Sequence, residues 1–373
     1  MLRKFPRKIK RLVIKVGSSV IATDRMKPRM AHLRSLVAQI SAVQRTDVDV
    51  ILVSSGAIVL GMGELNRRTR SVDLATLQAM AAIGQTVLMR KYNELFKKNK
   101  LKCAQVLLTW DDFDNRLRHN NARNTLRVML DWGVIPVVNE NDTISTDEIK
   151  FGDNDQLSAL VASMVQADLL VILSDVEGLY DLKGNGRKLF QEIKEITCDI
   201  EGAALGRKSQ HIGSVDGAAK KQMSRGGMAG KLSAVKIATQ AKIPCIIANG
   251  ETDNVIARIL KGERIGTFFM EQEEKLLLRK HWISFGAKPK GVVVVDDGAK
   301  QALLTGGKSL LLPGVVSWEG HFKKDDVVVV QDQKRLEIAR GISNYSTSEI
   351  GHITEKKGQR ELIHRDNLVL CER

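Results

Sequence analysis

The chain has 373 residues, a length that predicts two domains rather than one. Apolar residues make up 43% of it and aromatic residues only 4%, which favours an α/β protein with an aliphatic core. The four cysteines lie far apart and form no CxxC pair, so a disulfide framework and a zinc site are excluded and a reducing cytosol is expected. No apolar run approaches the ~18 residues of a membrane span.

The net charge of +15 is spread unevenly along the chain. Residues 1–30 hold ten Lys and Arg against one Asp, whereas residues 276–373 hold sixteen against twelve acids. A basic N-terminal segment attracts nucleic acid or phosphorylated ligands. A solvated, solubilising arm is the favoured interpretation of this segment.

Short β-branched runs alternate with longer amphipathic or alanine-rich stretches over the first 270 residues. This alternation predicts a mostly parallel sheet sandwiched by helices, in which ligands lie at the carboxyl ends of the strands. The expected strands are 11–17, 48–54, 102–109, 133–140, 168–175, 243–250 and 266–270, and the expected helices are 29–45, 73–99, 118–132, 155–166 and 229–241.

The pattern changes near residue 275, where a charged segment is followed by short strands with turns at close intervals. This change predicts a small β-rich domain. We therefore expect an α/β domain over residues 1–275 and a β-rich domain over residues 276–373.

Small residues and lysines follow several of the expected strands. KVGSSV places Lys15 beside a turn that can bind phosphate oxygens. VSSGAIVLG places Ser55 and Gly56 at the start of a helix, where the helix N-terminus can bind an anion or the serine can serve as an ordinary N-cap. GGMAGK places Lys231 in the first turn of a helix, where a cation is unfavourable unless an anion binds there too. These features together predict a site for a highly anionic ligand, as phosphoryl transfer requires.

Acids and amides gather in two further stretches, VVNEND and FGDNDQLSA. On the residues alone they indicate a metal site, a site for a polar small substrate, or loop and cap residues without chemistry. Asp142 belongs to the first stretch and Asn154 to the second. We expect the neighbouring Glu140, Asp153 and Asp155 to organise loops, cap helices or support other site residues.

The chain resembles the amino acid kinase family, followed by a C-terminal PUA domain. The resemblance rests on eleven stretches that match in order: KVGSSV, VSSGAIVLG, AAIGQTVLM, AQVLLT, NARNTL, VVNEND, FGDNDQLSA, GLY, GGMAGK, HWISFGAKPKG and ARGISNY. The family's usual GTGGMxTK appears here as SRGGMAGK, with Arg225 and Gly230 at the two threonine positions, and Ser18 replaces the Thr of KxGTS.

The resemblance implies ATP-dependent phosphorylation of the γ-carboxylate of L-glutamate, the first step of proline biosynthesis, with a requirement for Mg²⁺. It also implies self-association and, through the PUA domain, a possible RNA partner. The alternatives are another kinase of the family, acting on acetylglutamate, aspartate, carbamate or a nucleotide, and an RNA-binding protein.

The resemblance also implies roles for individual residues. Lys15, Lys231 and Asp175 would act in catalysis, and Lys15 would contact the transferred phosphate. Residues that would bind glutamate are Ser55, Gly56, Asp142 and Asn154, and those that would bind ATP are Lys15, Ser174, Asp175, Arg225, Gly226, Gly227, Met228, Ala229, Gly230 and Lys231.

The chemistry of the substrate agrees with these roles. Asp142 can pair with the ammonium group, and the Asn154 amide can bond carboxylate oxygens without repulsion. Because the attacking carboxylate is already an anion, the reaction needs neutralisation of repulsion by Lys15 and Lys231 rather than a general base. The residues that would ligate Mg²⁺ are not indicated.

Overall fold

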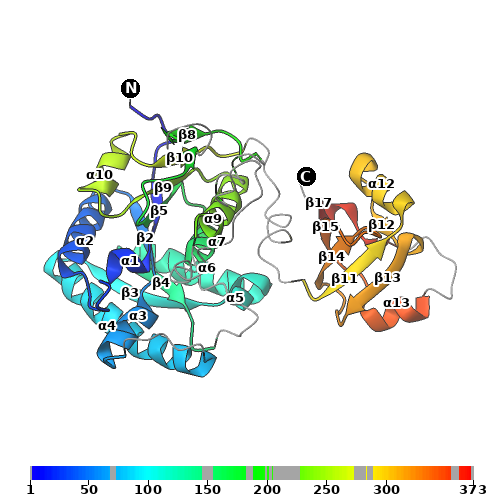
Figure 1. Ribbon diagram of the computed structural model, residues 1–373, viewed down its shortest axis with the longest axis horizontal. Coiled ribbons are helices and arrows are strands. Elements are labelled where there is room, and N and C mark those ends of the chain that lie inside the picture. Colours follow the sequence, from blue (N-terminus) through cyan, green and yellow to red (C-terminus); the bar gives the residue numbers. More distant parts are fainter. Residues whose placement is uncertain are drawn as a thin grey trace, which may run out of the picture. The chain divides into compact units, whose positions relative to one another are not determined.

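A computed structural model of the protein describes residues 2–67, 73–144, 154–181, 188–197, 200, 204, 227–272, 283, 289–353 and 361–370 (Figure 1). The chain divides into two compact units, one formed by residues 1–112 and 117–275 and the other by residues 113–116 and 276–373.

The first unit is built on an eight-stranded sheet. Its strands are β1 (Arg11–Val16), β2 (Asp49–Ser54), β3 (Lys102–Leu108), β4 (Val134–Glu140), β5 (Leu169–Ser174), β8 (Glu192–Ile193), β9 (Cys245–Asn249) and β10 (Thr267–Phe269). They lie in the order β3-β4-β2-β1-β5-β9-β10-β8. All neighbouring pairs are parallel except β9 with β10. A separate ribbon pairs β6 (Tyr180–Asp181) with β7 (Lys188–Leu189).

Helices cover both faces of this sheet, as Figure 1 shows for α2 on one side and α7 with α9 on the other. Strand β1 illustrates why: Leu12, Ile14 and Val16 enter a core that includes side chains of α2 and α4, while the alternate residue Lys15 meets α7. The helices are α1 (Ser18–Ile21), α2 (Met30–Gln44), α3 (Ala57–Glu64), α4 (Leu74–Lys98), α5 (Trp110–Asp114), α6 (Arg116–Asp131), α7 (Asn154–Val165), α9 (Met228–Gln240) and α10 (Val255–Leu260).

Helices α3 and α4 approach each other closely at two glycines. A Cβ on Gly61 would lie 1.9 Å from the carbonyl oxygen of Met80, and one on Gly84 would lie 1.8 Å from that of Ala57. Neither position has room for a side chain. Because α3 begins two residues after Ser55, this contact fixes α4 relative to the end of β2.

The second unit contains a five-stranded sheet and a two-stranded one. The order of the first is β13-β11-β14-β15-β17, and β12 pairs with β16. Its buried residues form a core of their own, which includes Val293, Leu303, Val330 and Leu362. The elements are β11 (Gly291–Val295), α12 (Asp297–Gly306), β12 (Leu310–Leu311), β13 (Val315–Gly320), β14 (Val327–Gln331), β15 (Glu337–Ile342), α13 (Thr347–Ile353), β16 (Glu361–Ile363) and β17 (Leu368–Leu370).

The predicted fold class is confirmed: a mostly parallel sheet sandwiched by helices precedes a β-rich module. The seven predicted strands and five predicted helices of the first unit are all present, with ends that differ by one or two residues. The pattern missed the shorter elements, including α1, α5 and α10, because four to six residues carry too little periodicity.

Candidate active site

Turns at the ends of four neighbouring strands are tied together by backbone hydrogen bonds. The N–H of Ser55 donates to Val16 O at 3.1 Å, that of Gly17 to Leu173 O at 3.0 Å, and that of Gly250 to Ser174 O at 2.8 Å. These bonds link the carboxyl ends of β2, β1, β5 and β9, the edge where open parallel sheets bind ligands.

Lys15 and Lys231 meet at this edge on a single carboxylate. Lys15 Nζ pairs with Asp155 Oδ1, and Lys231 Nζ lies 3.2 Å from Asp155 Oδ2. The lysines come from β1 and from the first turn of α9, and the aspartate from the first turn of α7. We call these three residues the lysine–aspartate cluster.

The lysine–aspartate cluster is buried, with Lys15 4% exposed, Lys231 5% and Asp155 0%. The prediction that Lys231 lies in the first turn of a helix is confirmed. Two ammonium groups and one carboxylate sum to one positive charge. Because charges interact strongly away from bulk water, this excess attracts an anion placed next to it.

An amide cluster adjoins the end of β2 and consists of Ser55, Asn139 and Asn154. Asn154 Nδ2 donates to Ser55 Oγ and to Asn139 Oδ1, each at 2.9 Å. Within the described residues, the buried Asn154 Oδ1 has no hydrogen-bond partner. This orientation differs from our expectation that the Asn154 amide donates to carboxylate oxygens, since its nitrogen already serves three protein acceptors, the third being the backbone oxygen of Ser54 at 3.4 Å.

Two further predicted substrate residues lie beside the amide cluster in sequence. Gly56 caps α3 with a φ of 103°, a left-handed conformation that favours glycine, and a Cβ there would meet Ile21 at 3.0 Å. Asp142 lies two residues after β4 and is half-buried.

The predicted nucleotide residues fall on two segments. Ser174 is the last residue of β5, and its Oγ donates to Asp175 Oδ1 at 2.8 Å. Asp175 is exposed. Gly227 caps α9, and a Cβ on it would meet none of the described atoms within 4 Å. Met228, Ala229 and Gly230 form the start of α9. Arg225 and Gly226 lie outside the described residues.

Three residues of the site were not identified as such from the sequence. Asp155 was expected to organise a loop, cap a helix or support other site residues; its pairing with both lysines is such a supporting contact, although the sequence did not indicate the lysines as its partners. Asn139 belongs to the quoted VVNEND stretch and Gln85 to AAIGQTVLM, and the two are hydrogen-bonded at 2.8 Å. In the sequence, the sign that these two residues belong to the site is that each stands in one of the eleven matching stretches. Their contact could not be predicted, because Gln85 lies on α4, far along the chain from Asn139.

Two buried titratable side chains of the same unit, Tyr92 and Cys245, are held neutral. Burial raises the pKa of the Tyr92 phenol well above its usual 10, although a 2.8 Å hydrogen bond to Ser54 Oγ opposes this. Burial, and next the charge of Asp155, raises the pKa of the Cys245 thiol well above its usual 9. Neither side chain therefore supplies a nucleophilic anion near neutral pH.

In the part of the chain that the structure describes, no three His, Cys, Asp or Glu side chains gather as metal ligands. The donor set there does not fit a metal held by protein groups alone. The described helices include none that combines the length and apolar character needed to cross a membrane.

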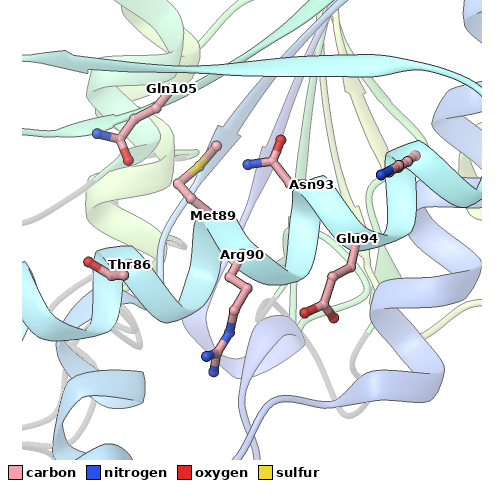
Figure 2. A pocket seen from close by; sticks show the side chains of 7 residues that line it. Thr86, Met89, Arg90, Asn93, Glu94 and Gln105 are labelled. Carbon is pink, nitrogen blue, oxygen red and sulfur yellow. The ribbon is translucent and has the colours of Figure 1, made fainter.

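A hollow of about 580 Å³ lies elsewhere, between α4 and the edge strand β3 (Figure 2). Six of its seven lining residues are polar or charged, and none of them belongs to the lysine–aspartate cluster at the strand ends. The lining residues are Thr86, Met89, Arg90, Asn93, Glu94, Lys97 and Gln105.

Known proteins resemble this chain over nearly its whole length. The amino acid kinase family model matches residues 10–249, and the PUA domain model matches residues 291–364. The glutamate 5-kinase of Thermoanaerobacter sp. (strain X514) is 42% identical over 374 residues, which cover 97% of this chain and 98% of the relative. That of Dictyoglomus turgidum is 44% identical over 379 residues, covering 98% of each, and that of Pelobacter propionicus 42% over 384 residues, covering 99% and 100%.

The chain belongs to the amino acid kinase family and carries a PUA domain after its kinase domain. Within the family its relatives at 40–44% identity are glutamate 5-kinases, which confirms the resemblance inferred from the eleven motifs.

Proposed function

We propose that the protein transfers the γ-phosphoryl group of ATP to the γ-carboxylate of L-glutamate and so forms glutamyl 5-phosphate for proline biosynthesis. The observation that carries the proposal is the pair of buried lysines on Asp155, placed beside the amide cluster at one sheet edge. Phosphoryl transfer between two anions requires this neutralisation of charge more than it requires a base.

In the proposed reaction the glutamate carboxylate attacks the γ-phosphorus, and the bond from that phosphorus to the bridging oxygen of ADP breaks. Lys15 and Lys231 pair with different oxygens of Asp155 and would contact the transferred phosphoryl group and the oxygen that leaves with ADP. Asp155 would hold both ammonium groups in place before the ligands arrive, so that little reorganisation is needed during the reaction.

Glutamate would bind at the amide cluster. Asn154 Oδ1 is a buried acceptor without a partner among the described residues, so we assign it to the ammonium group of the substrate. Asp142 would add the negative charge that the ammonium needs, and Ser55 with the Gly56 turn would lie against a carboxylate. This assignment reverses the expected role of the Asn154 amide and keeps the expected role of Asp142.

ATP would bind between the end of β5 and the start of α9, where it would meet Ser174, Asp175 and Gly227 to Gly230. We assign Arg225 and Gly226 to the same segment by sequence alone. The Mg²⁺ that the family implies would be carried by phosphate oxygens of ATP, where it neutralises charge.

A substrate panel tests the proposal. ADP release is measured with glutamate, acetylglutamate, aspartate, carbamate and UMP, each with ATP and Mg²⁺. We expect kcat/KM to be highest for glutamate by at least tenfold. Faster turnover of acetylglutamate or carbamate would refute the proposed substrate.

The remaining assignments extend the proposal. We assign catalysis to residues 1–275, the PUA domain to residues 276–373, and the protein to a reducing cytosol. Self-association is supported by Leu117, Val128 and Trp132, which are 70%, 42% and 75% exposed and project from one side of α6 and its end. Light scattering tests it, and a monomer at micromolar concentration would contradict it.

RNA binding through the PUA domain is the second candidate, and the charge of +4 over residues 276–373 gives it little support. A gel shift of the full chain with RNA, repeated at low and moderate salt, tests this candidate. Absence of binding at low salt would count decisively against it.

A further inference from the structure

A line of four amide side chains runs from the edge of the sheet to the amide cluster. Asn154 Nδ2 donates to Asn139 Oδ1 at 2.9 Å, and Asn139 Nδ2 donates to Gln85 Oε1 at 2.8 Å. Gln85 Nε2 in turn donates to Gln105 Oε1 at 3.0 Å. All three hydrogen bonds point the same way, so the orientation of each amide depends on that of the next.

The middle of this line cannot reverse on its own. Asn139 Oδ1 accepts the N–H of Glu140 at 3.0 Å as well as the amide of Asn154. A flipped Asn139 would turn its NH₂ group toward two other donors and leave its oxygen against Gln85 Oε1. Because Asn139 is 2% exposed, water cannot relieve such a mismatch, which costs the full penalty of buried unpaired groups.

The direction of the line decides what Asn154 offers to a ligand. Its NH₂ group donates to Asn139 Oδ1, to Ser55 Oγ and, at 3.4 Å, to the backbone oxygen of Ser54, so its oxygen is the group left over, buried and unpartnered within the described part of the chain. An oxygen binds an ammonium group, whereas an NH₂ group would repel it.

Gln85 is the inner support of this arrangement. It is 8% exposed and lies on α4, which the contact at Gly84 fixes against α3. Gln105, at the outer end, is exposed and lines the hollow in Figure 2, so water can take over its contact. Gln85 Oε1 is therefore the last acceptor in the line that solvent cannot replace.

We propose that Gln85 is a positioning residue for glutamate: by accepting from Asn139 Nδ2 it acts together with the backbone N–H of Glu140 to hold the amide line in the direction in which Asn154 presents its oxygen to the substrate ammonium. Gln85 does not touch the substrate in this proposal. The inference rests on the proposed function, because it takes the amide cluster as the glutamate site.

The test compares Gln85→Met with Gln85→Glu. Methionine keeps the length of the side chain but cannot accept the hydrogen bond from Asn139 Nδ2, which is then left unpaired. We expect KM for glutamate to rise about tenfold, the effect of one unpaired buried group. Glutamate at position 85 retains an oxygen that accepts from Asn139, so its KM should stay within about threefold of wild type. KM for ATP should change less than about twofold in both variants, which a general structural defect would not permit.

Gln240→Met is the matched control, because Gln240 is also 8% exposed but lies at the end of α9, away from the amide line. It should leave both KM values unchanged. If Gln85→Met proves too unstable to assay, Asn139→Leu interrupts the same line and should raise KM for glutamate in the same selective way.

Asn154→Ala distinguishes failure of the proposed glutamate site from failure of the role given to Gln85. If KM for glutamate rises in Asn154→Ala but is unchanged in Gln85→Met, the role of Gln85 is overturned and the glutamate site stays in place. An unchanged KM in Asn154→Ala overturns both. Equal losses in Gln85→Met and Gln85→Glu also overturn the inference, since the acceptor would then be irrelevant.

Discussion

The substitution Asp155→Asn removes one negative charge and almost no volume from the lysine–aspartate cluster. Asp155 is 0% exposed and is paired with Lys15 and Lys231, both about 5% exposed, so the cluster changes from one positive charge to two. Removing one partner of a buried ion pair lowers the free energy of unfolding by about 3–5 kcal/mol. For a domain of this size that corresponds to a fall of roughly 6–20 °C in Tm.

Turnover should fall as well. The two ammonium groups lose the carboxylate that holds them beside each other, and the loss of one preorganised electrostatic element lowers kcat by about 10²–10³. ATP supplies negative charge at the same place. We therefore expect saturating ATP to raise the Tm of the variant by more than that of the wild type.

Thermal unfolding with and without ATP, together with steady-state kinetics, measures these effects. Asp49→Asn is the control, because Asp49 pairs with Arg11 at 3.0 Å while both side chains are about one-third exposed, and such a pair contributes about 0–1 kcal/mol. A Tm within 2 °C of wild type, or a kcat within about threefold, would refute the role given to Asp155.

Three further outcomes are expected. Lys15→Met and Lys231→Met should each lose most turnover, by about 10²-fold or more, while the protein stays folded because Asp155 keeps one partner; near-normal kcat in either would remove that lysine from the mechanism. Asp142→Ala should raise KM for glutamate severalfold and leave KM for ATP unchanged, and the opposite pattern would place the two ligands the wrong way round. Burial raises the pKa of Tyr92, so its neutral form adds stability below pH 10 that is lost as pH rises further. The free energy of unfolding, measured in urea from pH 8 to 11, should therefore fall less steeply with pH in Tyr92→Phe than in the wild type. Equal slopes in the two proteins would contradict this.

Much of the fold follows from local patterns in the sequence. Runs such as RLVIKVG and VDVILVS became β1 and β2 because buried parallel strands need continuous aliphatic residues. The same logic placed Lys15, Ser55 and Ser174 at one edge, since parallel strands bring their carboxyl ends together.

The parts that could not be predicted depend on distant partners. An acid in the first turn of a helix is explained by the helix dipole, so nothing in FGDND distinguishes Asp155 from an ordinary cap. Its role appears only when β1 and α9 bring two lysines to it. Likewise, the orientation of the Asn154 amide is set by acceptors on Ser54, Ser55 and Asn139, and sequence patterns carry no information on hydrogen-bond direction.

The glycine contacts between α3 and α4 affect how variation in such sequences is read. Gly61 and Gly84 lie against backbone atoms at distances no Cβ can occupy, so these two positions must remain glycine whatever the enzyme phosphorylates. We expect substrate preference to diverge freely around them while they stay constant. A search for specificity determinants that ranks positions by invariance would score these glycines highly, although they report only how near two helices lie.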